Sequence, residues 1–187
     1  MTDMRVMAGG LPGLVVLEPA VFGDPRGFLF ESWNAARYRS TGLPERFVQD
    51  NVSFSTRGVL RGLHFQHPSA QGKLVTVLVG EVFDVAVDIR PGSPTFGKWA
   101  GRTLSAANHR QFYLPPGFAH GFVVTSPDAL VLYKCTEYYR PEEEQTLLWN
   151  DPDLGIDWPE PEPELSDRDR RGRRLAELMA EGVLSVG

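Results

Sequence analysis

The stretch Lys73-Leu-Val-Thr-Val-Leu-Val79-Gly80-Glu81-Val-Phe-Asp-Val-Ala-Val-Asp-Ile89 decides the fold class of this chain. It is rich in valine on both sides of Gly80, and short runs of β-branched residues favour strands. Gly80 stands where a tight turn would be, so the stretch predicts a β-hairpin. Polar and apolar residues alternate from Asp84 to Ile89, which is typical of a strand buried on one face.

Similar short runs continue on both sides of this stretch. The candidate strands are residues 14–17, 27–31, 47–55, 59–65, 112–114, 120–124 and 130–136. Turn signals separate them at Gly23-Asp24-Pro25, Pro91-Gly92, Pro115-Pro116-Gly117 and Ser126-Pro127-Asp128. Many short strands with regular turns predict an all-β sandwich or barrel.

Two helices are predicted. Asn34 would be the N-cap of a short helix that ends at Ser40. A second helix is expected from Ser166 to Met179, where Ser166 is followed three residues later by Asp169 in the spacing of a capping box. Gly172 weakens that helix. Residues 158–165 read as an extended linker against the barrel, so we expect one domain over residues 1–187, with a core at 14–165 and a helical tail at 166–187.

Composition excludes several classes of protein. Apolar residues make up 42% and charged residues 23% of 187 positions, as in ordinary soluble domains. The net charge of −5 disfavours nucleic acid as a partner, and the single Cys135 excludes an intramolecular disulfide. The first ten residues lack a signal-peptide core, and no run approaches the roughly 18 apolar residues of a membrane span. We therefore expect a cytoplasmic protein without a membrane partner.

Two histidine motifs narrow the fold. They are Gly58-Val-Leu-Arg-Gly-Leu-His64-Phe-Gln66 and Pro115-Pro-Gly117-Phe-Ala-His120, the outline of the two cupin motifs. The metal-binding version needs a second histidine where Gln66 stands and a glutamate a few residues later, which residues 69–72 do not offer. Two imidazoles without a nearby carboxylate make a poor site for a divalent cation. The motifs predict a cupin-type jelly-roll barrel without a metal.

A polar cluster surrounds the first motif. Its members, within seventeen residues, are Arg57, Arg61, His64, Gln66 and Lys73. Arg61 and His64 differ in strand parity, so a bend or bulge near Gly62 is needed to bring them to one face. The alternative is that these residues lie on a solvated outer face, as arginines and lysines usually do. Asp50, Asn51, Ser53 and Ser55 form a similar polar run, and the polar mouth of a barrel would explain both.

Tyr133 adds a phenol to an apolar strand. A tyrosine can protonate a carbanion if it is held on the correct side of a substrate, whereas strand tyrosines are more often amphipathic residues at the edge of a core. The sequence contains neither common phosphate-binding glycine loop and no Gly-x-Ser-x-Gly elbow. Proton transfer by histidine and tyrosine without a cofactor is the chemistry that remains.

The chain resembles the dTDP-4-dehydrorhamnose 3,5-epimerases, the RmlC-like cupins, over roughly residues 14–170. The matching segments are Val21–Phe28, Gln49–Asn51, Gly58–Gln66, Gln71–Leu74, Gly80–Asp88, Ser93–Gly97, Pro116–Phe122, Tyr133–Tyr139, Trp149–Pro152 and Ser166–Asp169. The resemblance implies an isomerase that inverts C3 and C5 of dTDP-4-keto-6-deoxyglucose, next to the C4 ketone, on the way to dTDP-L-rhamnose. It also implies a homodimer formed by strand exchange.

Roles for individual residues follow from the resemblance alone. It implies His64 as the base, Asp169 as the group that orients it, Tyr133 as the acid and Lys73 beside the C4 oxygen. Substrate contacts are implied for Arg26, Glu31, Gln49, Asn51, Arg61, His120, Glu144 and Arg168. Arg26 and Glu31 would serve a neighbouring subunit's site. Arg168 departs from the family's usual lysine, and either cation can meet a diphosphate.

Three other readings stay open. A single-position epimerase of a modified-sugar pathway would use the same His64 and Tyr133. A non-catalytic cupin that binds sugar nucleotides would be favoured if His64, Tyr133 or Asp169 were replaced, and all three are present. A ketoisomerase is conceivable, but the segments Asp24-Pro25-Arg26-Gly27 and Gln49-Asp50-Asn51 favour an epimerase.

Overall fold

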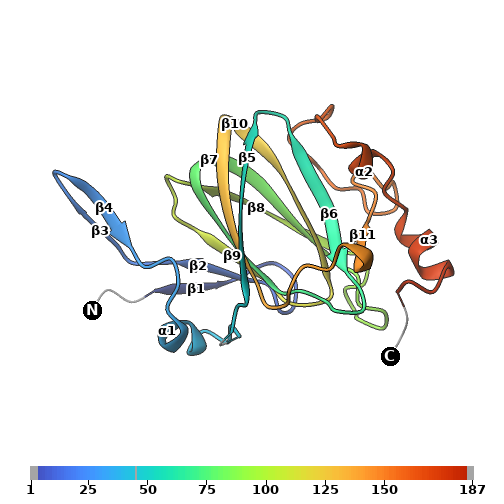
Figure 1. The fold of residues 1–187 in the computed structure, drawn as a ribbon, viewed down its shortest axis with the longest axis horizontal. Coiled ribbons are helices and arrows are strands. Elements are labelled where there is room, and N and C mark those ends of the chain that lie inside the picture. Colours follow the sequence, from blue (N-terminus) through green and yellow to red (C-terminus); the bar gives the residue numbers. More distant parts are fainter. Residues whose placement is uncertain (1–3, 45, 185–187) are drawn as a thin grey trace.

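The computed structural model describes residues 4–44 and 46–184, and most of its regular structure is β-strand (Figure 1). The strands are β1 (Arg5–Ala8), β2 (Val15–Glu18), β3 (Val21–Asp24), β4 (Gly27–Phe30), β5 (Gln49–Thr56), β6 (Leu60–Gln66), β7 (Lys73–Asp88), β8 (Trp99–Ser105), β9 (Gln111–Leu114), β10 (Phe118–Cys135) and β11 (Glu144–Thr146). The helices are α1 (Ala35–Arg39), α2 (Asp167–Arg170) and α3 (Leu175–Ala180), with a 3₁₀ turn at Pro141–Glu143. Among the described residues no helix is both long and apolar enough to cross a membrane.

Two long antiparallel strands, β7 and β10, form the centre of the sheet. They pair with each other from Phe118↔Asp88 to Cys135↔Lys73. On its other edge β7 pairs with β9 near its start and β8 near its end, while β10 pairs with β6 and then β5. Each long strand therefore holds different neighbours at its two ends, and the sheet curls around the space between them (Figure 1). The expected all-β barrel is confirmed.

Apolar packing fills the inside of the barrel and one of its outer faces. Inside, Val75, Val82 and Ala86 of β7 pack with Phe112 and Val131. Outside, Val85 and Val87 of the same strand pack against the chain after residue 147, including Trp158 and helix α3. Strand β7 is thus buried on both faces from Val82 to Asp88 apart from Phe83, and the predicted half-buried strand at this point is wrong.

The predicted hairpin at Gly80 is also wrong, because β7 continues through it. Gly80 has a φ of +74°, and the pairing with β10 shifts register beside it, between Val124 and Ala129. A Cβ there would lie 1.9 Å from the Asp128 carbonyl oxygen. The glycine and the turn signal at Ser126–Asp128 therefore mark one irregularity shared by two continuous strands. The two strands predicted at 120–124 and 130–136 are accordingly one strand, β10.

The helix predictions are partly confirmed. The Asn34 side chain accepts hydrogen bonds from the Ala36 and Arg37 amides, and Ser166 caps α2 by accepting from the Asp169 amide. The single helix from Ser166 to Met179 is wrong, since α2 ends at Arg170 and α3 begins at Leu175. Gly172 lies between the two helices and against the backbone of Leu148. A Cβ on Gly172 would be 2.8 Å from the Leu148 Cα.

Strands β3 and β4 form a separate two-stranded ribbon that projects from the barrel (Figure 1). Its apolar side chains face solvent in this chain: Phe28 is 61% and Leu29 is 67% exposed, and Val21 and Phe22 are exposed as well. Isolated two-stranded ribbons are marginally stable in water. This ribbon therefore needs a further contact.

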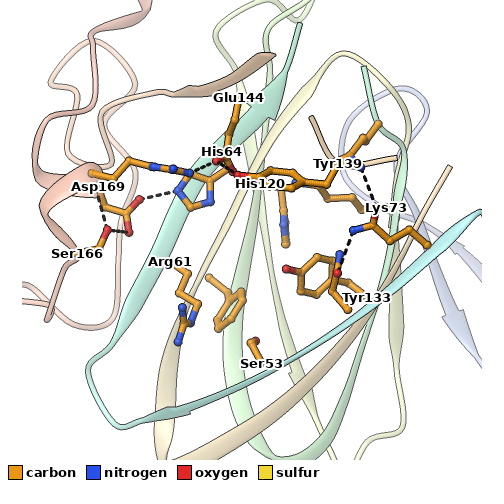
Figure 2. A pocket seen from close by; sticks show the side chains of 15 residues that line it. Ser53, Arg61, His64, Lys73, His120, Tyr133, Tyr139, Glu144, Ser166 and Asp169 are labelled. Atoms are coloured by element: carbon orange, nitrogen blue, oxygen red, sulfur yellow. Dashed lines mark hydrogen bonds and ion pairs between the residues drawn. The ribbon is translucent and has the colours of Figure 1, made fainter. Parts of the chain in front are cut away.

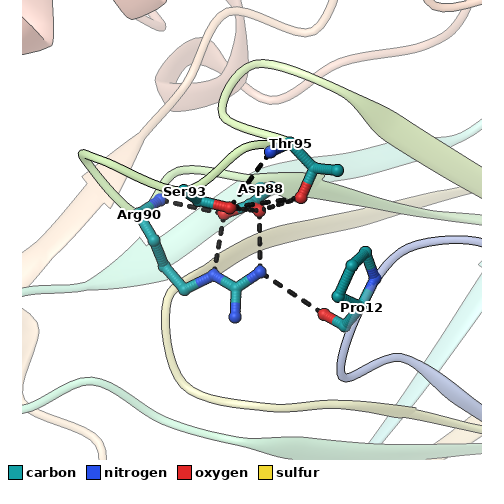
Figure 3. Close-up of polar contacts among 5 residues, drawn as sticks. All are labelled: Pro12, Asp88, Arg90, Ser93 and Thr95. Atoms are coloured by element: carbon teal, nitrogen blue, oxygen red, sulfur yellow. Dashed lines mark hydrogen bonds and ion pairs between the residues drawn. The ribbon is translucent and has the colours of Figure 1, made fainter.

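A buried carboxylate closes the turn after β7. Asp88 accepts hydrogen bonds from the Arg90 guanidinium and from the hydroxyls of Ser93 and Thr95, and Arg90 also reaches the Pro12 carbonyl (Figure 3). Burial by itself raises the pKa of Asp88, but these hydrogen bonds outweigh it and leave that pKa far below its usual range. The ionised form of Asp88 therefore holds this turn.

We expect Asp88→Asn to lower the free energy of unfolding by about 2–3 kcal/mol at pH 7, the usual contribution of hydrogen bonds to a charged group. Because the folded pKa is depressed, this contribution is complete above the unfolded carboxyl pKa of about 3.9 and is lost as pH falls through the lower folded value. Urea unfolding between pH 7 and pH 3 measures it. A deficit that did not shrink in acid would contradict the assignment, and the exposed Asp157→Asn is the control.

Candidate active site

A cavity of about 550 Å³ opens between strands β5, β6, β7 and β10 and helix α2 (Figure 2). Ten of the twelve residues that the sequence singled out line it: Gln49, Asn51, Arg61, His64, Lys73, His120, Tyr133, Glu144, Arg168 and Asp169. Three members of the polar cluster around the first histidine motif, Arg61, His64 and Lys73, therefore face the cavity. Arg57 lies on the solvated outside, and Gln66 is buried against the Ser69 and Tyr138 carbonyls.

His64 and Asp169 form a short polar contact in the cavity. His64 Nε2 lies 2.6 Å from Asp169 Oδ1, although the two residues are 105 positions apart. Ser166 donates its hydroxyl to Asp169 Oδ2 at 2.8 Å while it also caps α2. Burial raises the pKa of Asp169, but the hydrogen bonds from His64, Ser166 and the Gly62 amide outweigh it, so that pKa lies below its ordinary value. An ionised carboxylate accepts hydrogen bonds only, so the imidazole carries its proton on Nε2 and leaves Nδ1 as the basic atom.

A bulge in β6 places this histidine. His120 pairs with His64 and Phe122 pairs with Arg61, so β6 uses one residue more than β10 over this step. Gly62 lies in the bulge with a φ of +123°, and a Cβ on it would be 2.5 Å from Gly121 Cα. The predicted bulge is confirmed, and Arg61 and His64 line the same cavity.

Tyr133 and Lys73 lie near one end of the β7–β10 pair, and His120 lies near the other end. In Figure 2 Tyr133 and Lys73 are drawn on the other side of the cavity from His64 and Asp169. Burial raises the pKa of Tyr133, Cys135 and Tyr139 raise it further, and Arg61 lowers it. Burial lowers the pKa of the Lys73 ammonium, which Cys135 and Asp84 partly oppose. A half-buried phenol and a half-buried ammonium thus line the same cavity as the His64 imidazole.

A second histidine–aspartate contact lies deeper in the barrel. His120 Nε2 is 3.0 Å and 2.9 Å from the two carboxylate oxygens of Asp84, which has no exposed surface. The sequence analysis missed Asp84 because it read the residue as the polar member of an alternating strand. The available signal was parity: Asp84 shares its face of β7 with Val82 and Ala86, and both belong to the core.

The remaining polar side chains form the rim of the cavity. Tyr139 donates its hydroxyl to Glu144 at 2.6 Å, and Glu144 forms an ion pair with Arg168. Gln49 donates to Asn51 and accepts from the Tyr139 amide. Ser53 belongs to the polar run that the sequence analysis expected at the mouth of the barrel, and it lines the cavity. Sequence reasoning did not assign Tyr139, Gln71 or Phe122 to the cavity, and nothing in their local sequence distinguishes them from ordinary strand and loop residues.

Arg26 and Glu31 do not line the cavity of their own chain. Arg26 lies at the tip of the β3–β4 ribbon, exposed and paired with Asp24. Glu31 follows β4 and pairs with Arg37 at 3.1 Å. Their predicted roles in a neighbouring subunit's site stay predictions.

The donors around the cavity do not form a metal centre. Within residues 4–44 and 46–184 no group of three or more histidine, cysteine, aspartate or glutamate side chains is arranged to hold a metal ion. What the described side chains can do is move protons, with an oriented imidazole, a phenol across the cavity and an ammonium that stabilises negative charge.

Comparisons with known proteins agree with this geometry. Residues 9–177 match the family described as dTDP-4-dehydrorhamnose 3,5-epimerase. The dTDP-4-dehydrorhamnose 3,5-epimerase of Pseudomonas aeruginosa is 55% identical over 176 residues, which are 93% of this chain and 97% of that protein.

Solved structures are similar over nearly the whole chain. The 3,5-epimerase RmlC of Legionella pneumophila, in complex with dTDP-4-keto-L-rhamnose, is 52% identical, covers 96% of both chains and has a TM-score of 0.92. ChmJ, a 3′-monoepimerase from Streptomyces bikiniensis in complex with dTDP-quinovose, is 37% identical, covers 94% of this chain and 90% of its own, and has a TM-score of 0.88. The expected cupin-type jelly roll is confirmed.

We expect Gly62→Ala to lower the free energy of unfolding by about 2–4 kcal/mol, because a side chain there meets both a strained φ and the Gly121 backbone. Urea unfolding followed by circular dichroism measures the loss. Gly58→Ala is the matched control, since Gly58 has a φ of +81° but its added Cβ would be 3.9 Å from the nearest atom. Equal losses in the two variants would show that φ strain, and not the close approach of β6 to β10, requires glycine.

Proposed function

We propose that His64 and Tyr133 carry the two halves of each inversion that this chain catalyses. The chain belongs to the family of dTDP-4-dehydrorhamnose 3,5-epimerases and is an isomerase that inverts C3 and C5 of a dTDP-4-keto-6-deoxyhexose. One observation carries this proposal. His64 Nε2 lies 2.6 Å from Asp169 Oδ1, in a cavity that Tyr133 of β10 also lines. Absence of a metal or other cofactor, residence in the cytoplasm and lack of a nucleic-acid partner stay predictions from the sequence.

The C4 ketone makes the reaction possible. Removal of the proton at C3 or C5 gives a carbanion that delocalises onto the C4 oxygen as an enolate. His64 Nδ1 takes the proton, and the resulting imidazolium is stabilised by the ionised Asp169. The Lys73 ammonium lies beside the developing oxyanion and offsets its charge. Tyr133 then delivers a proton to the opposite face of the same carbon, which inverts it.

Incubation with dTDP-4-keto-6-deoxyglucose in D₂O, followed by NMR at C3 and C5, tests the proposed function. The wild-type chain should incorporate deuterium at both carbons and release the inverted product. His64→Ala should reduce exchange and inversion together, on the order of 10²- to 10⁴-fold, the usual contribution of a general base. Near-normal exchange in a folded His64→Ala variant would place the base elsewhere. Exchange confined to one carbon would identify a single-position epimerase instead.

Tyr133→Phe separates the two halves of the reaction. The ring is kept, so folding should survive, and His64 and Asp169 are unchanged. We expect deuterium to enter the recovered starting sugar while inverted product falls steeply, because the enolate is reprotonated by His64 on the face that it left. If exchange and inversion both continue at the wild-type rate, Tyr133 only packs, and Tyr139, which also lines the cavity, is the next residue to test.

A homodimer would complete both the fold and the site. Among the described residues β5 pairs only with β10, so its other edge is open, and its Val52 and Phe54 side chains are 60% and 59% exposed. The β3–β4 ribbon also exposes apolar side chains, among them Phe28 and Leu29 on its two faces. Open apolar edges are rarely left uncovered. We infer that each ribbon lies on β5 of a second copy and brings Arg26 and Glu31 toward that copy's cavity.

Subunit complementation tests this exchange. Arg26→Ala and His64→Ala should each impair the homodimer. When the two are unfolded together and refolded, a mixed dimer should contain one site with its own His64 and the partner's intact Arg26. We expect activity to return in the mixture and the mass in solution to be that of a dimer. Failure of the mixture to exceed the sum of the separate variants would mean that Arg26 does not serve the other subunit.

A further inference from the structure

Asp84 is a charged group that the proposed reaction does not use. It lies on the face of β7 that lines the inside of the barrel, between Val82 and Ala86, and none of its surface is exposed. A carboxylate in such a place costs folding free energy unless it is fully paired. Nothing in the turn or edge structure of β7 requires it, because Asp84 lies inside a regular run of pairs with β8 and β10.

Two groups in the cavity face this carboxylate. His120, from β10, places Nε2 within 3.0 Å of both oxygens, and the Lys73 ammonium interacts with Asp84 electrostatically. Burial raises the pKa of Asp84, while His120 and then Lys73 lower it. Both groups that Asp84 faces therefore belong to the lining of the cavity.

The geometry restricts the state of the His120 ring. An ionised carboxylate can only accept, so the Nε2 that lies between its two oxygens must carry a proton. Both hydrogen bonds that the His120 ring makes among the described residues use Nε2. The other nitrogen, Nδ1, is thereby left for a ligand in the cavity that His120 lines. His120 is also the cross-strand partner of His64, so its ring lies next to the base.

We propose that Asp84 is a positioning residue for the epimerisation, which fixes the Nε2-protonated state and the orientation of His120 so that Nδ1 meets the sugar beside His64. The inference rests on the proposed function, since it takes the cavity as the site of that reaction. The chain thus contains two histidine–aspartate pairs, whose histidines lie on the neighbouring strands β6 and β10. In one the aspartate orients a base, and in the other it orients a residue that holds the sugar against that base.

Asp88 provides a matched control on the same strand. It is also fully buried and has the same strand parity as Asp84, but its partners Arg90, Ser93 and Thr95 do not line the cavity. Replacement of either aspartate by asparagine removes one buried charge at nearly constant volume. A merely structural role predicts the same outcome for both variants, namely lower stability and unchanged activity of the folded enzyme.

The first measurement is ¹⁵N NMR of the histidine rings in the wild-type chain and in Asp84→Asn. We expect His120 to be protonated on Nε2 in the wild type and to populate the Nδ1-protonated tautomer in the variant, because an amide can either donate or accept. The Asp88→Asn spectrum should match the wild type. A wild-type His120 protonated on Nδ1 alone would overturn the proposal, and this result needs neither a folded variant nor an active enzyme. It is therefore independent of whether the proposed function holds.

The second measurement is a double-mutant cycle on the rate of inversion. We expect Asp84→Asn to lower kcat on the order of 10- to 100-fold, as loss of an orienting partner commonly does, and to change KM less. In the His120→Gln background the same substitution should have little further effect, since residues that act as a unit are not additive. Asp88→Asn should keep the kcat of the folded enzyme. An undiminished effect of Asp84→Asn without His120, or wild-type kinetics in Asp84→Asn, would overturn the proposal. Absence of exchange in the wild type would instead reject the proposed function.

Discussion

The pairing of β7 with β10 is the interaction on which the rest of this structure depends. It joins residues 73–88 to residues 118–135 along almost their whole length. Lys73 and Tyr133 come from one end of this pair, and Asp84 and His120 come from the other. The cavity is the space that these two curled strands enclose with β5 and β6. Four of the groups with the clearest chemistry are therefore held in place by the same set of backbone hydrogen bonds.

Three of the four buried aspartates among the described residues show how the barrel tolerates charge. Asp88 is surrounded by donors from its own turn, Asp84 faces a single imidazole across a strand pair, and Asp169 accepts from an imidazole, a hydroxyl and a backbone amide. The donors around Asp88 and Asp169 outweigh burial and lower the pKa of each, whereas burial raises the pKa of Asp84 and His120 and Lys73 oppose that rise only in part. The number of donors around each carboxylate, and not its distance from the cavity, therefore decides the direction of its pKa shift.

Much of the architecture was readable from the sequence, because strand propensity and turn residues act locally. The wrong predictions concern local signals that are compatible with two different structures. Gly80 and the Ser126–Asp128 turn signal looked like chain reversals, and only the pairing of two distant strands shows that they are one shared bulge. The exposed ribbon of β3 and β4 looked like an ordinary strand.

The site, too, was predicted from the sequence only in part. The parity mismatch between Arg61 and His64 predicted the bulge at Gly62 from the residues alone, but the partner of His64 lies 105 positions away and came from the family resemblance. Asp84 escaped because alternation on a strand does not say which face is buried. Arg26 and Glu31 lie outside the cavity of their own chain, and it is the proposed exchange of ribbons between two copies that would bring them to a site.

Asp169 lies 105 positions after His64 in the chain, so the ribosome also adds it much later. All the strands of the barrel precede α2 in the chain, so the sheet can be complete before the orienting carboxylate has been translated. Until Ser166 and Asp169 arrive, His64 stands in a formed cavity with no group to hold its ring. The cavity can therefore form first, and the contact between His64 and Asp169 forms last, when the segment that contains α2 folds back onto β6. A nascent chain that ends before α2 would lack both the carboxylate that orients His64 and the Arg168 side chain that lines the cavity beside it.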